Sequence, residues 1–300
     1  MATELAQRFA RILIVGASGQ LGTDLMDAFE DVQPIGLGHA EIAIENPQSV
    51  AAALDRYRPA LVLNTAAFHN VQICEQQPRA ALLVNALGVG ALARASAQRA
   101  CAVATFSTDY VFDGQKGAPY TEDDEPRPIN AYGLSKLAGE LLVQAATPRH
   151  FIFRTSGLFG RIGSTSKGYT FVDRVLRSAA AGEPISVVND MTFSPSYTRD
   201  VASAVRQIVE RADFGLYHVT NSGSCTWYDF AREALAQAGL DAPVTAISTA
   251  QWAALVRRPP NSALTNERMR RAGLPELPDW RSAVARYVRE RPSGVWTARP

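Results

Sequence analysis

A threonine, a tyrosine and a lysine in two short segments have the types and spacing needed to reduce a ketone. Thr108 opens the segment Thr-Asp-Tyr-Val-Phe-Asp-Gly, and Tyr132 and Lys136 lie four residues apart in Tyr-Gly-Leu-Ser-Lys. Residues four apart share one face of a helix, so both side chains can point into a cleft bordered by Thr108. There the phenol can donate a proton, and the lysine cation is expected to lower the pKa of Tyr132 from about 10 toward neutral pH.

The amino-terminal segment has the pattern of a strand, a glycine-rich turn and a helix. An apolar, β-branched run over 11–15 leads directly into Gly-Ala-Ser-Gly-Gln-Leu-Gly at 16–22. In this order Gly16 permits a tight turn, Gly19 lets backbone N–H groups approach a pyrophosphate, and Gly22 permits close packing of the next helix. The phosphates would rest at the N-terminus of that helix, which indicates a dinucleotide cofactor.

Composition places the chain among ordinary globular proteins. Its 300 residues are 47% hydrophobic and 20% charged, with a formal net charge of +1. That charge provides no strong field for nucleic acid or a membrane surface, and no apolar run is expected to reach the length of a membrane span. The first ten residues lack the pattern of a signal peptide. We therefore expect a cytoplasmic protein with neither nucleic acid nor a membrane as partner.

The cysteines and histidines show no pattern of a metal site. The three cysteines are widely spaced and odd in number, which indicates reduced thiols, and the four histidines are scattered. We therefore assign no required metal. Mg²⁺ stays an open alternative for which the sequence identifies no ligand set.

Apolar strand-like runs alternate with helical patterns through the first half of the chain. The runs cover 12–15, 61–64, 102–106 and 151–154, and a long alanine-rich helix is predicted over 78–99. This alternation predicts an α/β fold with a doubly wound parallel sheet of the Rossmann type. The strand ends bring residues 16, 65–67 and 107–108 to one carboxyl edge, where such sheets bind their ligands.

The pattern loosens after residue 156, where a smaller domain is expected to begin. We assign 1–156 to the dinucleotide-binding domain, rejoined by about 185–215, and 157–184 with 216–300 to a smaller C-terminal α/β substrate domain. Within these segments Asp200 is expected to cap a helix over 201–211. Thr226 and Asp229 have the pattern of a capping box at the start of another helix.

Together these motifs resemble the dTDP-4-dehydrorhamnose reductase family, a group of extended short-chain dehydrogenases/reductases. The resemblance runs along nearly the whole chain and includes Arg-Thr-Ser at 154–156, Ser-Pro-Ser-Tyr-Thr-Arg-Asp at 194–200 and Arg-Pro-Pro-Asn-Ser at 258–262. It implies an NAD(P)H-dependent oxidoreductase that reduces the C4 ketone of a nucleotide-linked 6-deoxyhexulose. The implied reaction is dTDP-4-dehydro-β-L-rhamnose to dTDP-L-rhamnose, in dTDP-rhamnose biosynthesis.

The resemblance also implies a role for each matching residue. Tyr132 is then the proton donor, Lys136 holds the nicotinamide ribose, and Thr108 hydrogen-bonds the substrate carbonyl. The substrate site would also include Asp109 and Gly157, although members usually carry tryptophan at the position of Gly157. Besides Tyr132 and Lys136, the cofactor would contact Gly16, Ser18, Gly19, Gln20, Leu21, Ala66, Ala67 and Phe68.

Two further residues have alternative interpretations. Asn85 either points to solvent or supports the cofactor site, as a matching asparagine does in short-chain dehydrogenases. Arg258, in the Arg-Pro-Pro turn, is either structural or a substrate-binding residue that meets a diphosphate, which guanidinium groups bind well.

The choice between NADPH and NADH depends on the end of the second strand. A carboxylate there binds the ribose 2′-hydroxyl and excludes a phosphate, whereas a basic residue accepts the phosphate. The segment 35–39, Ile-Gly-Leu-Gly-His, offers neither. Because no carboxylate is expected at this place, the sequence favours NADPH slightly, with NADH as the alternative.

Two other functions remain open for a chain of this kind, as a monomer or a homodimer. The first is another enzyme on the same scaffold, an epimerase or a 4,6-dehydratase, although a dehydratase carries a glutamate where this chain has Tyr110. The second is a non-catalytic NADP-binding regulatory subunit that resembles the one of methionine adenosyltransferase. Intact Thr108, Tyr132 and Lys136 argue against that subunit.

Overall fold

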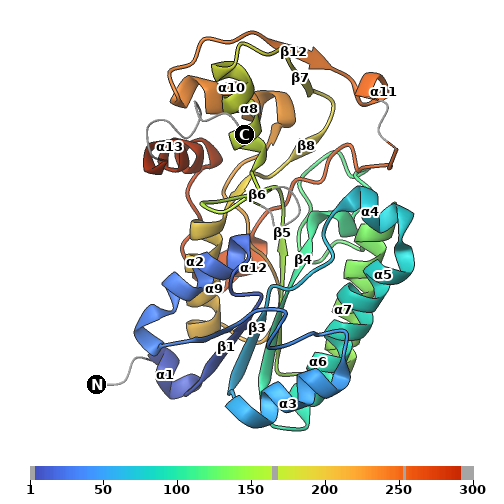
Figure 1. The fold of residues 1–300 in the computed structure, drawn as a ribbon, viewed down its shortest axis with the longest axis vertical. Coiled ribbons are helices and arrows are strands. Elements are labelled where there is room, and N and C mark those ends of the chain that lie inside the picture. The colour runs from blue at the N-terminus through green and yellow to red at the C-terminus, as the bar shows by residue number, and fades with distance from the viewer. Residues whose placement is uncertain (1–3, 164–167, 253–254, 292–300) are drawn as a thin grey trace.

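A six-stranded parallel sheet forms the centre of the larger domain (Figure 1). The computed structural model describes residues 4–163, 168–252 and 255–291. The sheet order is β2 (Ile35–Leu37), β1 (Ile12–Val15), β3 (Leu61–Asn64), β4 (Ala102–Thr108), β5 (His150–Thr155) and β10 (Gly215–His218). The strand order reverses between β1 and β3, so the doubly wound Rossmann sheet is confirmed.

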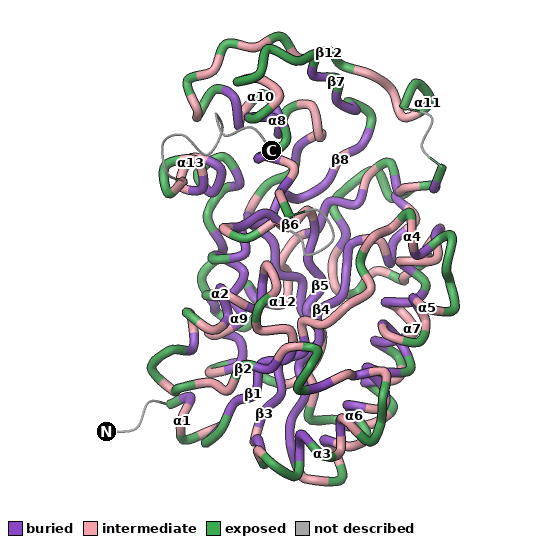
Figure 2. The backbone as a smooth tube through the Cα atoms, in the orientation of Figure 1, coloured by how far each residue is buried: buried purple, intermediate pink, exposed green. Residues whose placement is uncertain are grey.

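Helices cover both faces of this sheet. On one face lie α1 (Glu4–Arg8), α2 (Gln20–Ala28) and α9 (Thr198–Arg211), and on the other lie α3 (Pro47–Tyr57), α6 (Val89–Ala97) and α7 (Ala131–Ala146). Side chains alternate along each strand, so Ile12 and Ile14 face the first layer while Leu13 and Val15 face the second. The sheet is therefore buried from both sides, as Figure 2 shows.

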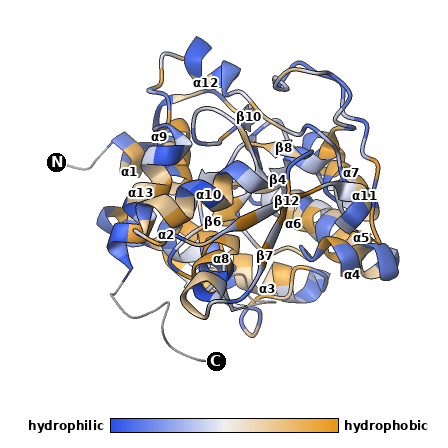
Figure 3. Ribbon diagram, turned by 90° about the horizontal axis from the view of Figure 1, so that it is seen from above, coloured by the Kyte–Doolittle hydropathy of each residue, from blue (hydrophilic) through white to orange (hydrophobic). Residues whose placement is uncertain are grey.

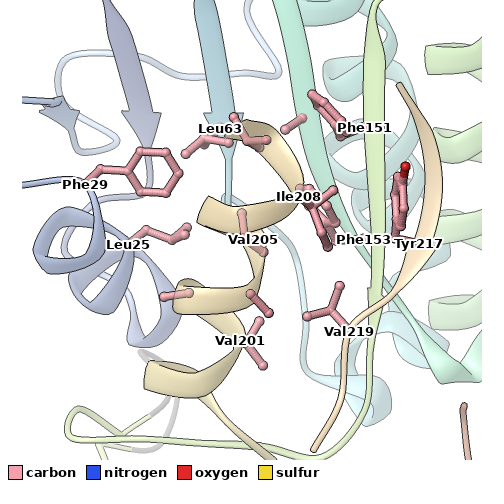
Figure 4. Close-up of a cluster of buried hydrophobic side chains, with 14 of the residues drawn as sticks. Leu25, Phe29, Leu63, Phe151, Phe153, Val201, Val205, Ile208, Tyr217 and Val219 are labelled. Carbon is pink, nitrogen blue, oxygen red and sulfur yellow. The ribbon is translucent and has the colours of Figure 1, made fainter. Parts of the chain in front are cut away.

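The first layer is held by apolar contacts between α2, α9 and the sheet. Figure 4 shows Leu25 of α2 on the side of Val205 of α9, and Ile208 of α9 next to Phe153 of β5, with Phe151 further along that strand. All five side chains are buried. Each buried side chain of this size contributes about 1.5–3 kcal/mol to this layer. Seen from above, hydrophobic strands lie inside and hydrophilic segments such as α12 (Glu267–Arg271) lie outside (Figure 3).

The predicted long helix is continuous over Pro78–Ala97 and changes its winding in the middle. It consists of α5 (Pro78–Leu82), the π-helical η2 (Leu83–Gly88) and α6. By length and composition alone this helix could cross a membrane, contrary to the expectation that no apolar run is long enough. Half of its most apolar window is buried, and α6 packs on α3 and α7. That arrangement is typical of a core helix.

The smaller domain packs three helices around short strand pairs. Its helices are α8 (Phe171–Ala180), α10 (Trp227–Gln237) and α13 (Trp280–Glu290), and its strand pairs are β7 (Ile185–Val188) with β12 (Val244–Ile247) and β8 (Thr192–Phe193) with β11 (Cys225–Thr226). The remaining elements are η1 (Glu30–Val32), α4 (Val71–Gln76), η3 (Asp109–Val111), β6 (Leu158–Phe159), β9 (Ser196–Tyr197) and α11 (Thr249–Trp252).

The strand pairing moves the predicted boundary of the rejoining segment. Because β7 pairs with β12, residues 185–188 belong to the smaller domain, and the assignment of 185–215 to the larger one is wrong at its start. The larger domain is rejoined by α9 and by β10, which pairs with β5. A strand-like pattern alone does not say which sheet the strand joins, so the sequence could not place this boundary.

One of the two predicted helix caps is wrong. The capping box of Thr226 and Asp229 at the start of α10 is confirmed. Asp200, by contrast, lies inside the first turn of α9, which begins at Thr198. Its carboxylate accepts hydrogen bonds of 2.6 Å from both terminal nitrogens of Arg286, so it ties α9 to α13 instead of capping α9.

A neutral histidine is buried at the end of β10. The side chain of His218 is fully buried, its Nδ1 lies 3.2 Å from the carbonyl oxygen of Thr265, and Nε2 has no hydrogen-bond partner among the described residues. Burial lowers the pKa of His218 to about 3, and the nearby Arg154 cation acts in the same direction. The folded protein therefore keeps this imidazole uncharged, whereas the unfolded chain protonates it near pH 6.5.

His218 should make folding stability fall at mildly acidic pH. Between pH 6.5 and 3 the unfolded state binds one more proton at this site, so the free energy of unfolding falls by about 1.4 kcal/mol per pH unit. The free energy of unfolding can be measured with urea at pH 7 and at pH 5. Its decrease between the two pH values should be about 2 kcal/mol smaller in His218→Asn than in the natural protein. An unaltered pH dependence in His218→Asn would show that His218 does not cause it.

Candidate active site

The glycine-rich turn after β1 takes the predicted shape. Gly16 has a φ of +77°, and a Cβ there would lie 2.5 Å from Oγ1 of Thr65. A Cβ on Gly22 would lie 2.1 Å from the carbonyl oxygen of Gly16, so α2 packs directly on the turn. Gly19 is the N-cap of α2, and no side chain caps that end. The uncapped helix terminus, with Ser18 in the turn and Gln20 and Leu21 in its first turn, fits a pyrophosphate.

Thr108 and Asp109 lie at the carboxyl end of β4. The hydroxyl oxygen of Thr108 accepts a hydrogen bond from the backbone N–H of Tyr110 and donates one to Asp109 Oδ1 at 3.0 Å. The other oxygen, Oδ2, accepts bonds from Ser156 at 2.8 Å and Ser262 at 2.5 Å. Burial raises the pKa of Asp109 to about 6, against the three hydroxyl groups, which lower it. Thr108 thus caps the turn of η3 and also lies beside Tyr132.

Tyr132 lies in the first turn of α7, beside Thr108. Burial raises the pKa of the Tyr132 phenol above its ordinary value, while the hydrogen bond with Thr108 acts in the opposite direction. The expectation that this pKa is lowered toward neutral is therefore wrong for the protein alone, because loss of hydration and the nearby Asp109 carboxylate raise the pKa more than the hydrogen bond with Thr108 lowers it. A phenol that stays protonated can still give its proton to a substrate oxygen.

Lys136 is buried one turn further along α7. Only 5% of the residue is exposed, and this burial lowers the pKa of its ammonium to about 8, although the carboxylate of Glu140 acts to raise it. Glu140 in turn accepts two hydrogen bonds from Arg154 on β5, at 2.9 and 2.7 Å. Lys136 is therefore held in a dry environment and can lose its charge just above neutral pH.

Asn85 joins the loop after β3 to α7. It lies in η2, and its side chain accepts from the N–H of Phe68 and donates to the carbonyl of Phe68, both at 2.8 Å. Its amide also lies 3.0 Å from the hydroxyl of Ser135, which donates to the carbonyl of Tyr132. Asn85 is 1% exposed, so the solvent-facing alternative is wrong. The loop with Ala66, Ala67 and Phe68 is thus fixed relative to Tyr132.

Arg258 reaches the same site from the smaller domain. Its guanidinium stacks on the ring of Trp252, 4.4 Å from the centroid, and hydrogen-bonds the phenol of Tyr110. The ring of Tyr110 in turn packs edge-on against Tyr132, with centroids 6.1 Å apart. Asn130, the N-cap of α7, also donates to the carbonyl of Arg257. The segment before Pro259 therefore contacts the N-cap of α7 directly through Arg257 and approaches Tyr132 through the ring of Tyr110.

Gly157 follows β5 and has a neighbour that leaves no room for a side chain. Its φ is +52°, and a Cβ would lie 2.2 Å from Cε2 of Phe193. The Phe193 ring stacks on Trp227, with centroids 3.9 Å apart. The space that a tryptophan at 157 would enter is thus taken by an aromatic pair from β8 and α10.

The sequence did not reveal the partners of these residues. Ser156, Ser262 and Ser135 were not predicted as site residues, although Ser156 and Ser262 lie in the motifs at 154–156 and 258–262. Among the described residues, no group of three or more histidine, cysteine, aspartate or glutamate side chains could hold a metal ion.

The end of β2 also differs from expectation. The carboxylate of Glu41 folds back and accepts a hydrogen bond of 2.8 Å from the N–H of Gly38. The premise that no carboxylate lies at this strand end is therefore wrong. The sequence could not show this, because the carboxylate comes from a residue four positions beyond the strand end.

Comparisons with known proteins agree with this geometry. Residues 10–292 match the family model described as RmlD substrate binding domain. A dTDP-4-dehydrorhamnose reductase from Aggregatibacter actinomycetemcomitans is 37% identical, with 92% of this chain and 97% of the relative covered. A probable dTDP-4,6-dihydroxy-2-methyloxan-3-one 4-ketoreductase from Streptomyces antibioticus is 38% identical, with 91% and 93% covered.

A solved structure has the same fold along nearly its whole length. It is dTDP-4-dehydrorhamnose reductase from Bacillus anthracis str. Ames in complex with NADP, with a TM-score of 0.89 and 32% identity. The similarity covers 94% of this chain and 99% of that one.

The contact between Gly157 and Phe193 predicts a large and specific cost for a side chain at 157. Gly157→Ala should lower the free energy of unfolding by about 3 kcal/mol, because a left-handed backbone and a ring overlap both oppose the methyl group. Urea denaturation of Gly157→Ala, Phe193→Leu and the double variant measures the coupling between the two positions.

Gly117 provides the matched control for this experiment. It has a φ of +72°, and nothing lies within 4 Å of an added Cβ, so Gly117→Ala should cost only the backbone part, about 1 kcal/mol. In the double variant, the smaller side chain at 193 leaves more room for the methyl group at 157. Part of the free energy of unfolding that Gly157→Ala loses should therefore be recovered. Equal costs at 157 and 117, or strictly additive effects, would contradict the overlap.

Proposed function

This chain belongs to the RmlD substrate binding domain family and is a nicotinamide-dependent oxidoreductase, and we propose that it reduces the C4 ketone of a dTDP-linked 6-deoxyhexulose. The observation that carries the proposal is the contact of the Tyr132 phenol with Thr108 at the carboxyl edge of the sheet, with Lys136 buried one helical turn away.

The proposed reaction adds a hydride to carbon 4 and a proton to its oxygen, so that a ketone becomes a secondary alcohol. The dinucleotide supplies the hydride when bound. In this proposal, the Tyr132 hydroxyl holds the carbonyl oxygen, polarises it and delivers the proton. The Thr108 hydroxyl turns from Asp109 Oδ1 to donate its one proton to the same oxygen. The raised pKa of Tyr132 keeps that proton available at neutral pH.

Lys136 is proposed to act on both partners of the reaction. Its ammonium holds the nicotinamide ribose by hydrogen bonds and offsets the negative charge that develops as Tyr132 gives up its proton. The buried position strengthens this effect, because charges interact more strongly where water is excluded.

The proposed substrate is dTDP-4-dehydro-β-L-rhamnose, with dTDP-L-rhamnose as the product, in a cytoplasmic biosynthetic role. Both curated relatives carry dTDP sugars in their names and differ in the sugar itself. Arg258 is proposed to bind the diphosphate, because its guanidinium is held between Trp252 and Tyr110 next to Tyr132. Asp109 and Gly157 are proposed to line the sugar pocket.

Removal of the Tyr132 hydroxyl should stop turnover and spare cofactor binding. With the enzymatically prepared keto sugar, the decrease in nicotinamide absorbance should slow at least about 100-fold in Tyr132→Phe, because the proton donor is lost. Fluorescence titration should give a cofactor affinity within about twofold of the natural protein, since phenylalanine fills the same space.

Tyr57→Phe serves as the control, because Tyr57 ends α3 at the opposite edge of the sheet. It should retain full activity. Undiminished turnover in Tyr132→Phe would show that another group donates the proton. Cofactor binding without turnover of any keto sugar in the natural protein would instead favour the regulatory subunit.

The pKa of Lys136 predicts an upper pH limit for the free enzyme. Because this pKa is about 8, the ammonium is present below pH 8 and is lost above it. The kcat/KM for the dinucleotide, which reports the free enzyme, should therefore fall about tenfold per pH unit above 8. Lys136→Arg should abolish that fall whatever its absolute rate, since a guanidinium stays charged. A flat profile to pH 10 in the natural protein would refute the assignment.

A further inference from the structure

We infer that Glu41 makes this enzyme select NADH over NADPH. The inference rests on the proposed function, since it concerns the cofactor of the same site. It assigns a specificity-determining role to a residue outside the glycine-rich turn and outside the Tyr132–Lys136 helix.

The Glu41 carboxylate lies where the second strand meets the phosphate-binding turn. Its Oε2 accepts the N–H of Gly38 at 2.8 Å, directly after β2. The last residue of β2, Leu37, accepts hydrogen bonds from the N–H groups of Gly16 at 2.8 Å and Ala17 at 3.2 Å. The two consecutive residues Leu37 and Gly38 therefore hydrogen-bond the phosphate-binding turn and the Glu41 carboxylate, respectively.

Glu41 substitutes for a side chain at position 38. In a Rossmann domain an acidic residue at the end of the second strand binds the ribose 2′-hydroxyl. Here the strand is followed by Gly38, and a Cβ built there would lie 3.1 Å from Glu41 Oε2. The carboxylate therefore occupies the space into which an acidic residue at 38 would project, and it can accept a hydrogen bond from the same hydroxyl.

The charges around this point oppose a 2′-phosphate. Such a group carries nearly two negative charges at neutral pH. The segment 35–46 contains two glutamates, Glu41 and Glu45, and neither lysine nor arginine. The imidazole of His39, the one other ionisable side chain of the segment, contacts Glu45 at 2.8 Å, so its charge when protonated is compensated. A 2′-hydroxyl meets no such repulsion.

Family membership does not decide this choice. The Bacillus anthracis relative was solved with NADP and shares 32% identity with this chain. A difference in cofactor preference within the family must therefore come from local residues, and position 41 offers the required charge.

Fluorescence titration of the full-length protein with NADH and with NADPH, at one ionic strength and pH 7.5, tests the inference. The natural protein should bind NADH about tenfold more tightly than NADPH, an effect of the size expected for one like charge at close range near a protein surface. Glu41→Gln keeps an oxygen that can accept the Gly38 N–H and removes the charge. It should bring the two dissociation constants within about twofold of each other, mainly by tightening NADPH.

Two further variants sharpen the test. Adding His39→Arg to Glu41→Gln places a permanent cation beside the strand end and should reverse the preference in favour of NADPH. Glu30→Gln removes the same charge from η1, before the opposite end of β2, and should leave the ratio of the natural protein unchanged.

The outcomes separate this inference from the proposed function. If both cofactors bind and NADPH binds as tightly as NADH, or if Glu41→Gln leaves the ratio unaltered, Glu41 does not set the preference while the oxidoreductase proposal stands. If neither dinucleotide binds, the proposed function fails and this inference fails with it.

Discussion

The buried carboxylate of Asp109 is the constraint on which the arrangement of the site depends. An unpaired carboxylate is very costly inside a protein, and this one accepts hydrogen bonds from hydroxyl groups in three separate places: Thr108 beside it, Ser156 after β5 and Ser262 in the smaller domain. A shift of any of these segments would leave the carboxylate short of a partner. The position of Thr108 is thereby tied to the contact between the two domains through Ser262.

The opposite side of the site is held by neutral groups. The side chain of Asn85 hydrogen-bonds the backbone of Phe68 and the hydroxyl of Ser135. The Ser135 hydroxyl in turn donates a hydrogen bond to the carbonyl of Tyr132. The wider π-helical turn of η2 carries this asparagine, which agrees with the tendency of such turns to occur at functional sites. The loop with Phe68 and the start of α7 with Tyr132 consequently share one rigid support.

The secondary-structure elements of the site could be predicted from local sequence patterns. The contacts between residues far apart in sequence could not. The turn at Gly16 and the helix with Tyr132 and Lys136 could be predicted, because strand period, glycine spacing and four-residue spacing are local properties. The partner of Asp109 in the smaller domain could not, since Ser262 is 153 residues away in sequence. The same applies to the sheet that β7 joins. The direction of the Tyr132 pKa shift depended on burial, which no motif encodes.

The late arrival of β10 has a consequence for synthesis of the chain. β5 ends at Thr155, but its neighbour β10 begins only at Gly215, after the first part of the smaller domain. At about 5–20 residues per second, a ribosome needs roughly 3 to 12 seconds to supply that strand. During this interval the apolar edge of β5 is open to pairing with other nascent chains. The order of elements along the gene thus creates a window in which chaperones would matter most.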